Sequence, residues 1–370
     1  MAIDFNDRVK EMNISGIRKI FEAAGPGSIN LGIGQPDFDT PQHIKDEAIK
    51  AINEGFTGYT SNMGMPELRE ALSKKFKAEN GLDYSPSEIM VTSGASEGIY
   101  IALQALCNTG DEVIVPDPGF VSYSALSRLS GASVVPVPLG SKLKYDPEKL
   151  KDHITRNTKV IVLNSPSNPT GMVQSEEEIK AIADIASDRN VTIISDEVYE
   201  HFIYEGKHVS PAKYSDNVVT INAASKTYSM TGWRLGYLAA RPEYIEQILK
   251  VHQYVQAAAC SISQRAALAA VTGPQECVAE MREEFRKRRD YLLGELHAMG
   301  IDCVTPQGAF YAFPYIGDDN KAVTELLKNG VISTPGTAFG QCGKGYVRFS
   351  YATSLENIKK ATGIMKRVLC

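Results

Sequence analysis

The sequence has no excess of basic residues, and this argues against a protein that binds nucleic acids. Its 370 residues include 39 lysines and arginines against 44 aspartates and glutamates, a net charge of −5 at pH 7. Proteins that bind DNA or RNA usually neutralise phosphate groups with a surplus of basic side chains. We therefore expect no nucleic-acid partner.

Long apolar runs and a secretory signal are also missing. The charge-free stretches, such as Gly98–Gly110, are shorter than the roughly 18 apolar residues that a membrane span needs. The N-terminal residues carry charges and lack the apolar segment of a signal peptide. The six cysteines form no C-x-x-C pair, which is typical of reduced thiols in a chain of this length. We expect a soluble cytoplasmic protein without a membrane partner.

Two cofactor signatures are absent as well. The six histidines show no H-x-x-x-H motif and no cysteines at metal-binding spacing, so we predict no metal site. The segment LGIGQPDF (Leu31–Phe38) lacks the third glycine of G-x-G-x-x-G, which argues against a nicotinamide cofactor.

The chain does contain a regular alternation of short β-branched runs and helical stretches. Its length favours two domains, at roughly 150 residues per domain. Several runs are apolar throughout, as in parallel strands that helices cover on both faces. We predict an α/β large domain with a mostly parallel central sheet flanked by helices. The predicted strands are Ile89–Thr92, Glu112–Val115, Val134–Val137, Val160–Leu163, Val191–Ile194 and Val218–Ile221.

The pattern changes after about residue 275 and indicates a second, smaller α+β domain. A long charged helix is predicted at Met281–Gly300, because its apolar residues recur at helical spacing. Short strands are expected near Ala309–Phe313, Val331–Ser333 and Tyr346–Ser350, followed by a last helix from about Leu355.

Polar residues follow three of the apolar runs directly. Ligands of an open parallel sheet bind beyond the carboxyl ends of its strands. The turn-rich loop Asn164–Gly171 follows one run, Asp196 and Tyr199 follow the next, and Lys226 and Arg234 follow the third. A carboxylate, a phenol, a lysine and an arginine are therefore expected at one edge of the sheet.

Each of these side chains also has an ordinary structural explanation. Asp196 could cap the following helix, and Tyr199 could be a core aromatic with a solvated hydroxyl. Lys226 and Arg234 could be solvated surface charges.

The segment Ile89–Gly98 leads from a strand through a small-residue turn into a helix, whose free N–H groups can hold a phosphate monoester. Taken together, these groups describe pyridoxal phosphate chemistry.

Five motifs in order resemble the class I and II aminotransferases of the aspartate aminotransferase fold, most closely their archaeal and bacterial aromatic/aspartate branch. The resemblance extends over essentially the whole chain, from ISGIRKIFEAA (Ile14–Ala24) and LGIGQPDFDTP (Leu31–Pro41) to the last helix. The motifs are SNPTG (Ser167–Gly171), SDEVYEHF (Ser195–Phe202), SKTYSMTGWRLGY (Ser225–Tyr237), GAFYAFP (Gly308–Pro314) and GYVRFSYA (Gly345–Ala352).

The resemblance implies pyridoxal 5′-phosphate as the cofactor and assigns it three catalytic residues. Lys226 would form the covalent link to its aldehyde and later carry a proton. Asp196 would keep the ring nitrogen protonated. Tyr199 and Asn168 would bond the phenolic oxygen of the ring. The implied cofactor-binding residues are Tyr59, Gly94, Ala95, Ser96, Phe120, Asn168, Asp196, Tyr199, Ser225, Lys226 and Arg234.

The same resemblance implies substrate contacts and a dimer. Arg348 would hold the substrate carboxylate, with Gly34 and Asn168 beside it; the alternative for Arg348 is a solvent-facing arginine on an edge strand. Phe120 would stack on the cofactor ring, or it is an ordinary core phenylalanine. Tyr59 matches a tyrosine that reaches the phosphate of the neighbouring subunit, which implies a homodimer with shared active sites.

The resemblance further implies how the chain is divided between two domains. Residues 1–45 would join the small domain, 46–280 would form the cofactor-binding domain, and 281–370 would form the C-terminal small domain. The small domain would close over the substrate and exclude water.

The implied activity transfers an amino group from an amino acid to a 2-oxo acid such as 2-oxoglutarate. The implied donors are aromatic amino acids, glutamate and aspartate. The alternatives are an aspartate-selective aminotransferase, and a fold relative that performs β-elimination or decarboxylation with the same site residues. A transcription regulator of this fold would need an added DNA-binding domain, for which 370 residues leave no room.

The substrate range depends on what meets the distal end of the substrate. Aspartate-selective members often carry a lysine at the position of Ser96, which a second carboxylate would need as a partner. Arg18 or the partner subunit could supply a cation instead. The apolar Ile17 and the aromatic Phe120 and Tyr311 could line a pocket for aromatic side chains, or could be core residues.

Overall fold

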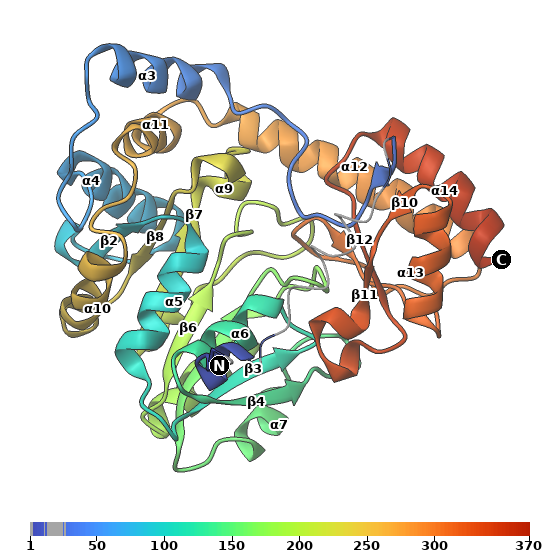
Figure 1. The fold of residues 1–370 in the computed structure, drawn as a ribbon, viewed down its shortest axis with the longest axis horizontal. Coiled ribbons are helices and arrows are strands. Elements are labelled where there is room, and N and C mark those ends of the chain that lie inside the picture. Colours follow the sequence, from blue (N-terminus) through green and yellow to red (C-terminus); the bar gives the residue numbers. More distant parts are fainter. Residues whose placement is uncertain (1–2, 11, 13–24, 26) are drawn as a thin grey trace.

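The computed structural model describes residues 3–10, 12, 25 and 27–370. Figure 1 shows a large α/β domain and, beside it, a smaller α+β domain formed mainly by the C-terminal part of the chain. This architecture confirms the fold class predicted from the alternating pattern. The motif Ile14–Ala24 and its residues Ile17 and Arg18 lie outside the described residues.

The large domain is built on a seven-stranded sheet. Its strands are parallel except β8, which runs antiparallel to both of its neighbours. All six predicted strands are present, most of them one or two residues longer than expected. The strand β8 was not predicted, because four residues that include a glycine give little β-branched signal. In spatial order the strands are β2 (Ile89–Thr92), β8 (Gly236–Ala239), β7 (Val218–Ala223), β6 (Thr192–Asp196), β5 (Thr158–Asn164), β3 (Glu112–Asp117) and β4 (Ser133–Pro138).

Helices cover both faces of this sheet, which explains why its strands are apolar throughout. Val160 and Val162 of β5 join one buried cluster, whereas Ile161 and Leu163 join another on the opposite face. Alternate side chains of one strand point to opposite faces, so both sets become buried. The first cluster includes residues of α5 (Ala95–Leu106), α6 (Val121–Leu129) and α10 (Pro242–Val255); the second includes residues of α7 (Pro147–Asp152) and α8 (Glu176–Asp188).

A third cluster covers the β2 end of the sheet. Phe76 and Tyr237 pack edge to face within it. It includes residues of α3 (Gln42–Asn53), α4 (Pro66–Lys75) and α11 (Ser261–Thr272).

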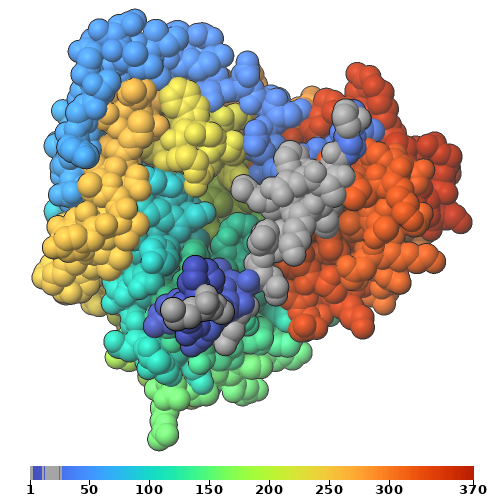
Figure 2. Space-filling view, viewed as in Figure 1, coloured from blue at the N-terminus to red at the C-terminus, as the bar shows by residue number. Residues whose placement is uncertain are grey.

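The small domain packs helices against short strands. Its three-stranded antiparallel sheet has the order β11 (Thr334–Pro335), β12 (Val347–Ser350) and β9 (Tyr311–Ala312). Strand β1 (Ile29–Asn30) pairs in parallel with β10 (Val331–Ile332). Ile29 and Asn30 therefore pack against this domain, and Figure 2 shows blue atoms beside its red and orange surface.

The helices of the small domain bury one apolar face. Phe285, Leu292 and Leu296 of the first helix are fully buried, as their spacing predicts. This helix begins before the predicted Met281 and runs through residue 280, the domain boundary that the resemblance implies. The helices are α12 (Glu276–Ala298), α13 (Asp319–Lys328) and α14 (Leu355–Leu369).

Among the described residues, no helix combines the length and the apolar character that crossing a membrane requires.

Candidate functional site

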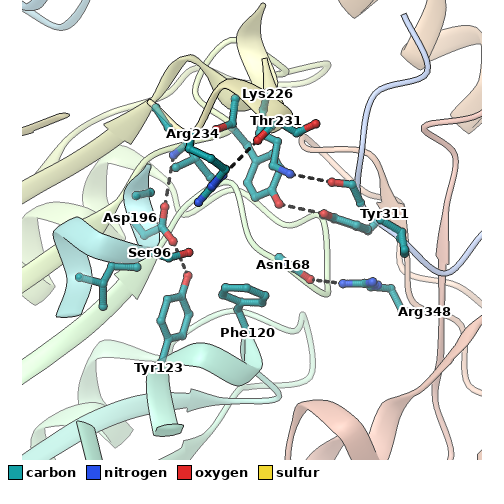
Figure 3. A pocket seen from close by; sticks show the side chains of 18 residues that line it. Ser96, Phe120, Tyr123, Asn168, Asp196, Lys226, Thr231, Arg234, Tyr311 and Arg348 are labelled. Atoms are coloured by element: carbon teal, nitrogen blue, oxygen red, sulfur yellow. Dashed lines mark hydrogen bonds between the residues drawn. The ribbon is translucent and has the colours of Figure 1, made fainter. Parts of the chain in front are cut away.

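A cavity of about 270 Å³ opens at the carboxyl ends of the central strands, between the two domains (Figure 3). It collects side chains that are more than 300 residues apart in the sequence, from Gly34 to Arg348. Small-molecule sites in proteins have volumes of this order. The predicted site residues that line it are Gly34, Ala95, Ser96, Phe120, Asn168, Asp196, Tyr199, Ser225, Lys226, Arg234 and Arg348.

Lys226 follows β7 and lies in the short helix α9 (Ala224–Thr227). Its Nζ donates a hydrogen bond of 2.6 Å to the carbonyl oxygen of Gly34. Burial, followed by the positive charges of Arg348 and Arg234, lowers the pKa of Lys226 to about 8, although the charge of Asp196 opposes this effect. The amine is therefore less basic than a surface lysine, as a nucleophile or proton carrier near neutral pH must be.

This environment predicts how Lys226 titrates in the cofactor-free protein. An amine-selective reagent attacks only the neutral amine, so modification of Lys226 should rise with pH and level off above about pH 8. Arg348→Met should move the midpoint upwards, because it removes a positive charge that favours the neutral amine. Peptide mapping after timed labelling measures the midpoint, with the exposed Lys213 as the internal control. A Lys226 midpoint at or above the ordinary value of 10.5 would contradict this assignment.

Asp196 is the last residue of β6, and its carboxylate is buried. Its Oδ2 accepts a hydrogen bond of 2.7 Å from the hydroxyl of Tyr123, and its Oδ1 accepts a longer one, 3.4 Å, from the N–H of Val198. Burial raises the pKa of Asp196 to about 6, although both hydrogen bonds oppose this rise. No helix begins directly after it, because residues 198–201 form a turn, so the capping explanation is wrong.

Tyr123 is a site residue that the sequence analysis missed. It lies three residues after Phe120, on the same side of the chain at the start of α6, and the two rings pack edge to face with 5.6 Å between centroids. The spacing in DPGFVSY was a usable signal. Its direction towards Asp196 depends on how α6 packs on the sheet, which spacing alone does not give.

Tyr199 is buried, and its hydroxyl lies 2.8 Å from the hydroxyl of Tyr311. Burial raises the pKa of Tyr199 well above its ordinary value, and the neighbouring Tyr311 adds to this effect. The alternative of a core aromatic with a solvated hydroxyl is therefore wrong. Tyr311 lies so close to the Gly34 backbone that a Cβ at position 34 would overlap its hydroxyl, at 1.8 Å.

Arg348 lies on β12, the middle strand of the small sheet, and is only 2 % exposed. The alternative of a solvent-facing arginine on an edge strand is therefore wrong. Its Nη1 donates to Oδ1 of Asn168 over 2.8 Å, and its Nη2 donates to the carbonyl oxygen of Gly32. The guanidinium lies over the ring of Tyr311 at 4.6 Å. A planar fork held in this way suits a carboxylate.

The guanidinium of Arg348 also has a free donor. Its Nε is buried and has no hydrogen-bond partner among the described residues. An unpaired buried donor is costly unless a bound group uses it. This orphan donor marks the Arg348 end of the cavity as a place for a ligand.

The turn between β2 and α5 has the form of a phosphate-binding cradle. Gly94 adopts a φ of +88°, and a Cβ there would lie 2.5 Å from Nη2 of Arg234. Within the described part of the chain, the N–H groups of Ala95 and Ser96 have no hydrogen-bond partner. Free N–H groups at a helix start and an arginine together fit a phosphate monoester. Ser225 also lines the cavity.

Two predicted residues do not line the cavity. Gly94 lies directly behind it, in contact with Arg234. Tyr59 lies in the loop between α3 and α4 and is 94 % exposed. Its predicted contact with a neighbouring subunit concerns a second chain and stays a prediction.

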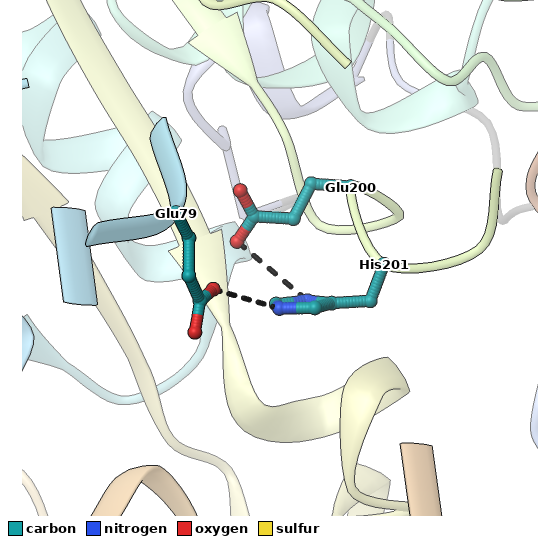
Figure 4. A group of neighbouring side chains, drawn as sticks. All are labelled: Glu79, Glu200 and His201. Carbon is teal, nitrogen blue, oxygen red and sulfur yellow. Dashed lines mark hydrogen bonds and ion pairs between the residues drawn. The ribbon is translucent and has the colours of Figure 1, made fainter. Parts of the chain in front are cut away.

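A polar network of Glu79, Glu200 and His201 lies next to α9 (Figure 4). His201 contacts Glu79 through Nε2 at 3.0 Å and Thr227, the residue after Lys226, through Nδ1 at 3.1 Å. Glu200 is buried beside His201 and pairs with the ammonium of Lys75. The distant positions 79 and 200 gave no sequence signal for this cluster. Through His201, it links the helix that carries Lys226 to the segment Phe76–Asn80.

Comparison with known proteins gives a consistent result. The family described as "Aminotransferase class I and II" matches residues 26–364. A "Probable aspartate aminotransferase" of Methanocaldococcus jannaschii is 46 % identical over 98 % of this chain and 99 % of its own. "Aromatic-amino-acid aminotransferase 2" of Thermococcus litoralis is 40 % identical over 98 % of both chains. The structure of the Thermus thermophilus aspartate aminotransferase with maleate superposes with a TM-score of 0.95, at 40 % identity over 100 % of both chains.

Proposed function

Since the chain belongs to the class I and II aminotransferase family and is an aminotransferase, we propose that its cavity binds pyridoxal 5′-phosphate. One observation carries the proposal: a lysine of lowered pKa lies in one cavity with a phosphate-binding turn and a buried arginine fork. The free N–H groups of Ala95 and Ser96 match the phosphate, and the buried Asp196 matches the ring nitrogen.

When bound, this cofactor supplies an aldehyde that takes up the substrate amine and a ring that accepts the electrons of the Cα–H bond. The residues at the cofactor ring each have one task. Asp196 holds the proton on the ring nitrogen, because a buried carboxylate stabilises the adjacent cation. Tyr199 and Asn168 donate to the phenolic oxygen, and Phe120 packs against the ring face.

The residues around the reacting atoms hold and move the substrate. Arg348 binds the α-carboxylate through its guanidinium, whose Nε is free, with Asn168 and the Gly34 backbone beside it. Lys226 removes the proton from the substrate Cα and returns a proton to the cofactor side, which requires the neutral amine that its lowered pKa provides. The phosphate is held by Gly94, Ala95, Ser96, Ser225 and Arg234.

The overall reaction consists of two half-reactions, from amino acid to 2-oxo acid and back. A panel of amino donors with 2-oxoglutarate tests it: glutamate should form in equal amount to the new oxo acid. Release of ammonia or sulfide without glutamate would instead indicate the β-elimination alternative.

We further propose a broad donor range that covers aromatic amino acids, glutamate and aspartate. Both aspartate and aromatic aminotransferases occur among the relatives. Within the described part of the cavity, the cations are Lys226, Arg234 and Arg348, and each has another task. A second substrate carboxylate would therefore need a partner from elsewhere, because an unpaired buried charge is costly.

Specificity constants for phenylalanine, tyrosine and aspartate test the donor range, at a fixed concentration of 2-oxoglutarate. We expect the aromatic donors to equal or exceed aspartate. A preference for aspartate beyond roughly a hundredfold, about 2.7 kcal/mol of differential transition-state binding, would establish the aspartate-selective alternative.

We also propose a homodimer with shared active sites. The proposal is based on Tyr59, which matches a tyrosine that reaches the phosphate of the neighbouring subunit and which is exposed in the single chain. Tyr59→Ala and Lys226→Ala chains should each be inactive alone. After subunit exchange, a heterodimer holds one intact site of two, so an equal mixture should recover about a quarter of the wild-type activity. Tyr315→Ala, which removes another exposed tyrosine, should stay active alone. No recovery after verified exchange would contradict shared sites.

Residues 1–45 and 281–370 would form the closing small domain, and 46–280 the cofactor domain. The pairing of β1 with β10 supports this grouping.

Six unpaired cysteines support a reducing cytoplasm as the site of action.

A further inference from the structure

A buried pair of side chains, Glu97 and His252, lies next to the turn between β2 and α5. Glu97 belongs to the first turn of α5, and His252 belongs to α10. Nδ1 of His252 lies 2.7 Å from Oε1 of Glu97; the imidazole is fully buried and the carboxylate side chain is 9 % exposed. Neither residue lines the cavity. Any influence on a ligand must therefore pass through the turn.

The second oxygen of Glu97 binds the turn itself. Its Oε2 accepts a hydrogen bond of 2.5 Å from the N–H of Ser93. This contact occupies the Ser93 N–H, whereas the N–H groups of Ala95 and Ser96 stay free at the cavity wall. The carboxylate therefore fixes the backbone at Ser93, next to the two free N–H groups.

Two other contacts hold the same turn. The Thr92 hydroxyl donates to the carbonyl oxygen of Gly94 over 3.1 Å. Strand β8 approaches so closely that a Cβ on Gly236 would lie 2.6 Å from the nitrogen of Ala95. The turn is therefore fixed by its own strand and by β8, and Glu97 adds the contact with α10.

The hydrogen-bond pattern makes both members of the pair necessary. To donate to the carboxylate, His252 must carry its hydrogen on Nδ1; its Nε2 is buried without a partner in the described chain. Loss of the imidazole leaves the buried carboxylate with one partner fewer, and loss of the carboxylate leaves the Ser93 N–H and the imidazole unpaired. Buried polar groups without partners favour rearrangement of the segment that carries them.

We propose that Glu97 and His252 are positioning residues for the phosphate of the cofactor. Together they hold the Ser93–Ser96 turn in the shape in which the N–H groups of Ala95 and Ser96 converge on one oxygen-rich group. The proposal rests on the proposed function, because it assumes that this turn receives the phosphate.

Binding of pyridoxal phosphate and of pyridoxal, which lacks the phosphate, tests the pair in the cofactor-free protein. Glu97→Ala and His252→Leu should each weaken pyridoxal phosphate about ten- to hundredfold, the effect of a lost hydrogen bond to a charged group. Their affinity for pyridoxal should change by less than about threefold, because pyridoxal does not use the turn. His252→Asn places an amide N–H near the position of Nδ1 and should keep most of the wild-type affinity.

Glu178→Ala is the matched control. Glu178 also accepts a hydrogen bond from a backbone N–H at a helix start, that of Ser175, and it pairs with Lys144. Its loss should lower the melting temperature without changing the affinity for pyridoxal phosphate.

Each result of this comparison has a distinct meaning. Wild-type affinity for pyridoxal phosphate in both Glu97→Ala and His252→Leu would overturn the inference, as would an equal loss for both ligands, which indicates a merely structural role. If Glu97→Ala does not fold, the two His252 variants decide. The inference then requires that His252→Leu weakens binding of pyridoxal phosphate but not of pyridoxal, and that His252→Asn keeps most of the wild-type affinity. A wild-type protein that binds neither ligand, or binds both equally, would overturn the proposed function itself.

Discussion

Lys226→Ala should reduce amino transfer by at least about 10⁴-fold, because it removes both the covalent anchor and the proton carrier. Within the described part of the cavity, Lys226 is the lysine that lines the wall. Initial rates with a good donor and 2-oxoglutarate measure the effect, at saturating cofactor. The fold should survive, since the Lys226 amine has a backbone carbonyl as its hydrogen-bond partner and no ion pair with any residue that the structure describes.

One variant and one chemical rescue serve as controls for this loss. Lys213→Ala removes an exposed lysine that pairs with Glu176 and should keep full activity. Added methylamine should restore a small part of the activity of Lys226→Ala, because a free amine can carry the proton in place of the side chain. Lys226→Ala with more than about a tenth of the wild-type rate would contradict the assignment.

Asp196→Ala should lower turnover by about 10²- to 10³-fold while the cofactor still binds, because the ring nitrogen loses the charge that keeps it protonated. Arg234→Ala should do the opposite: it should weaken cofactor affinity about tenfold or more and leave turnover at saturation largely intact. Cofactor titration followed by rate measurement separates the two effects. The reverse pattern would show that the ring and phosphate ends of the cavity are assigned the wrong way round.

Tyr123→Phe offers a milder test of the same end of the cavity. It removes the hydrogen bond of 2.7 Å to Asp196 and keeps the carboxylate. Turnover should therefore fall by less than in Asp196→Ala.

The fold could be predicted where the pattern is strong. Runs such as Val160–Leu163 are apolar throughout because both faces of β5 are buried, and they were found. Strand β8 was missed, because its antiparallel pairing with β2 and β7 is a property of the assembled sheet and not of its four residues.

The residues of the candidate site likewise fall into those that sequence motifs predict and those that only the packing of the fold reveals. Lys226, Asp196 and Arg348 lie in motifs with strong signals, and the structure brings them to one cavity. Tyr123 was missed, as was the pair Glu97 and His252, because each meets its partner only through packing between distant elements. Burial of Arg348 likewise depends on β12 having a strand on each side.

Borohydride reduction of the cofactor-loaded protein, followed by peptide mapping, tests the central claim most directly. Reduction fixes the cofactor to the amine that holds it, so the modified residue can be read from the peptide. We predict a single modified peptide that carries the label on Lys226. A label on any other lysine, or no covalent label in a protein that transfers amino groups, would contradict the account.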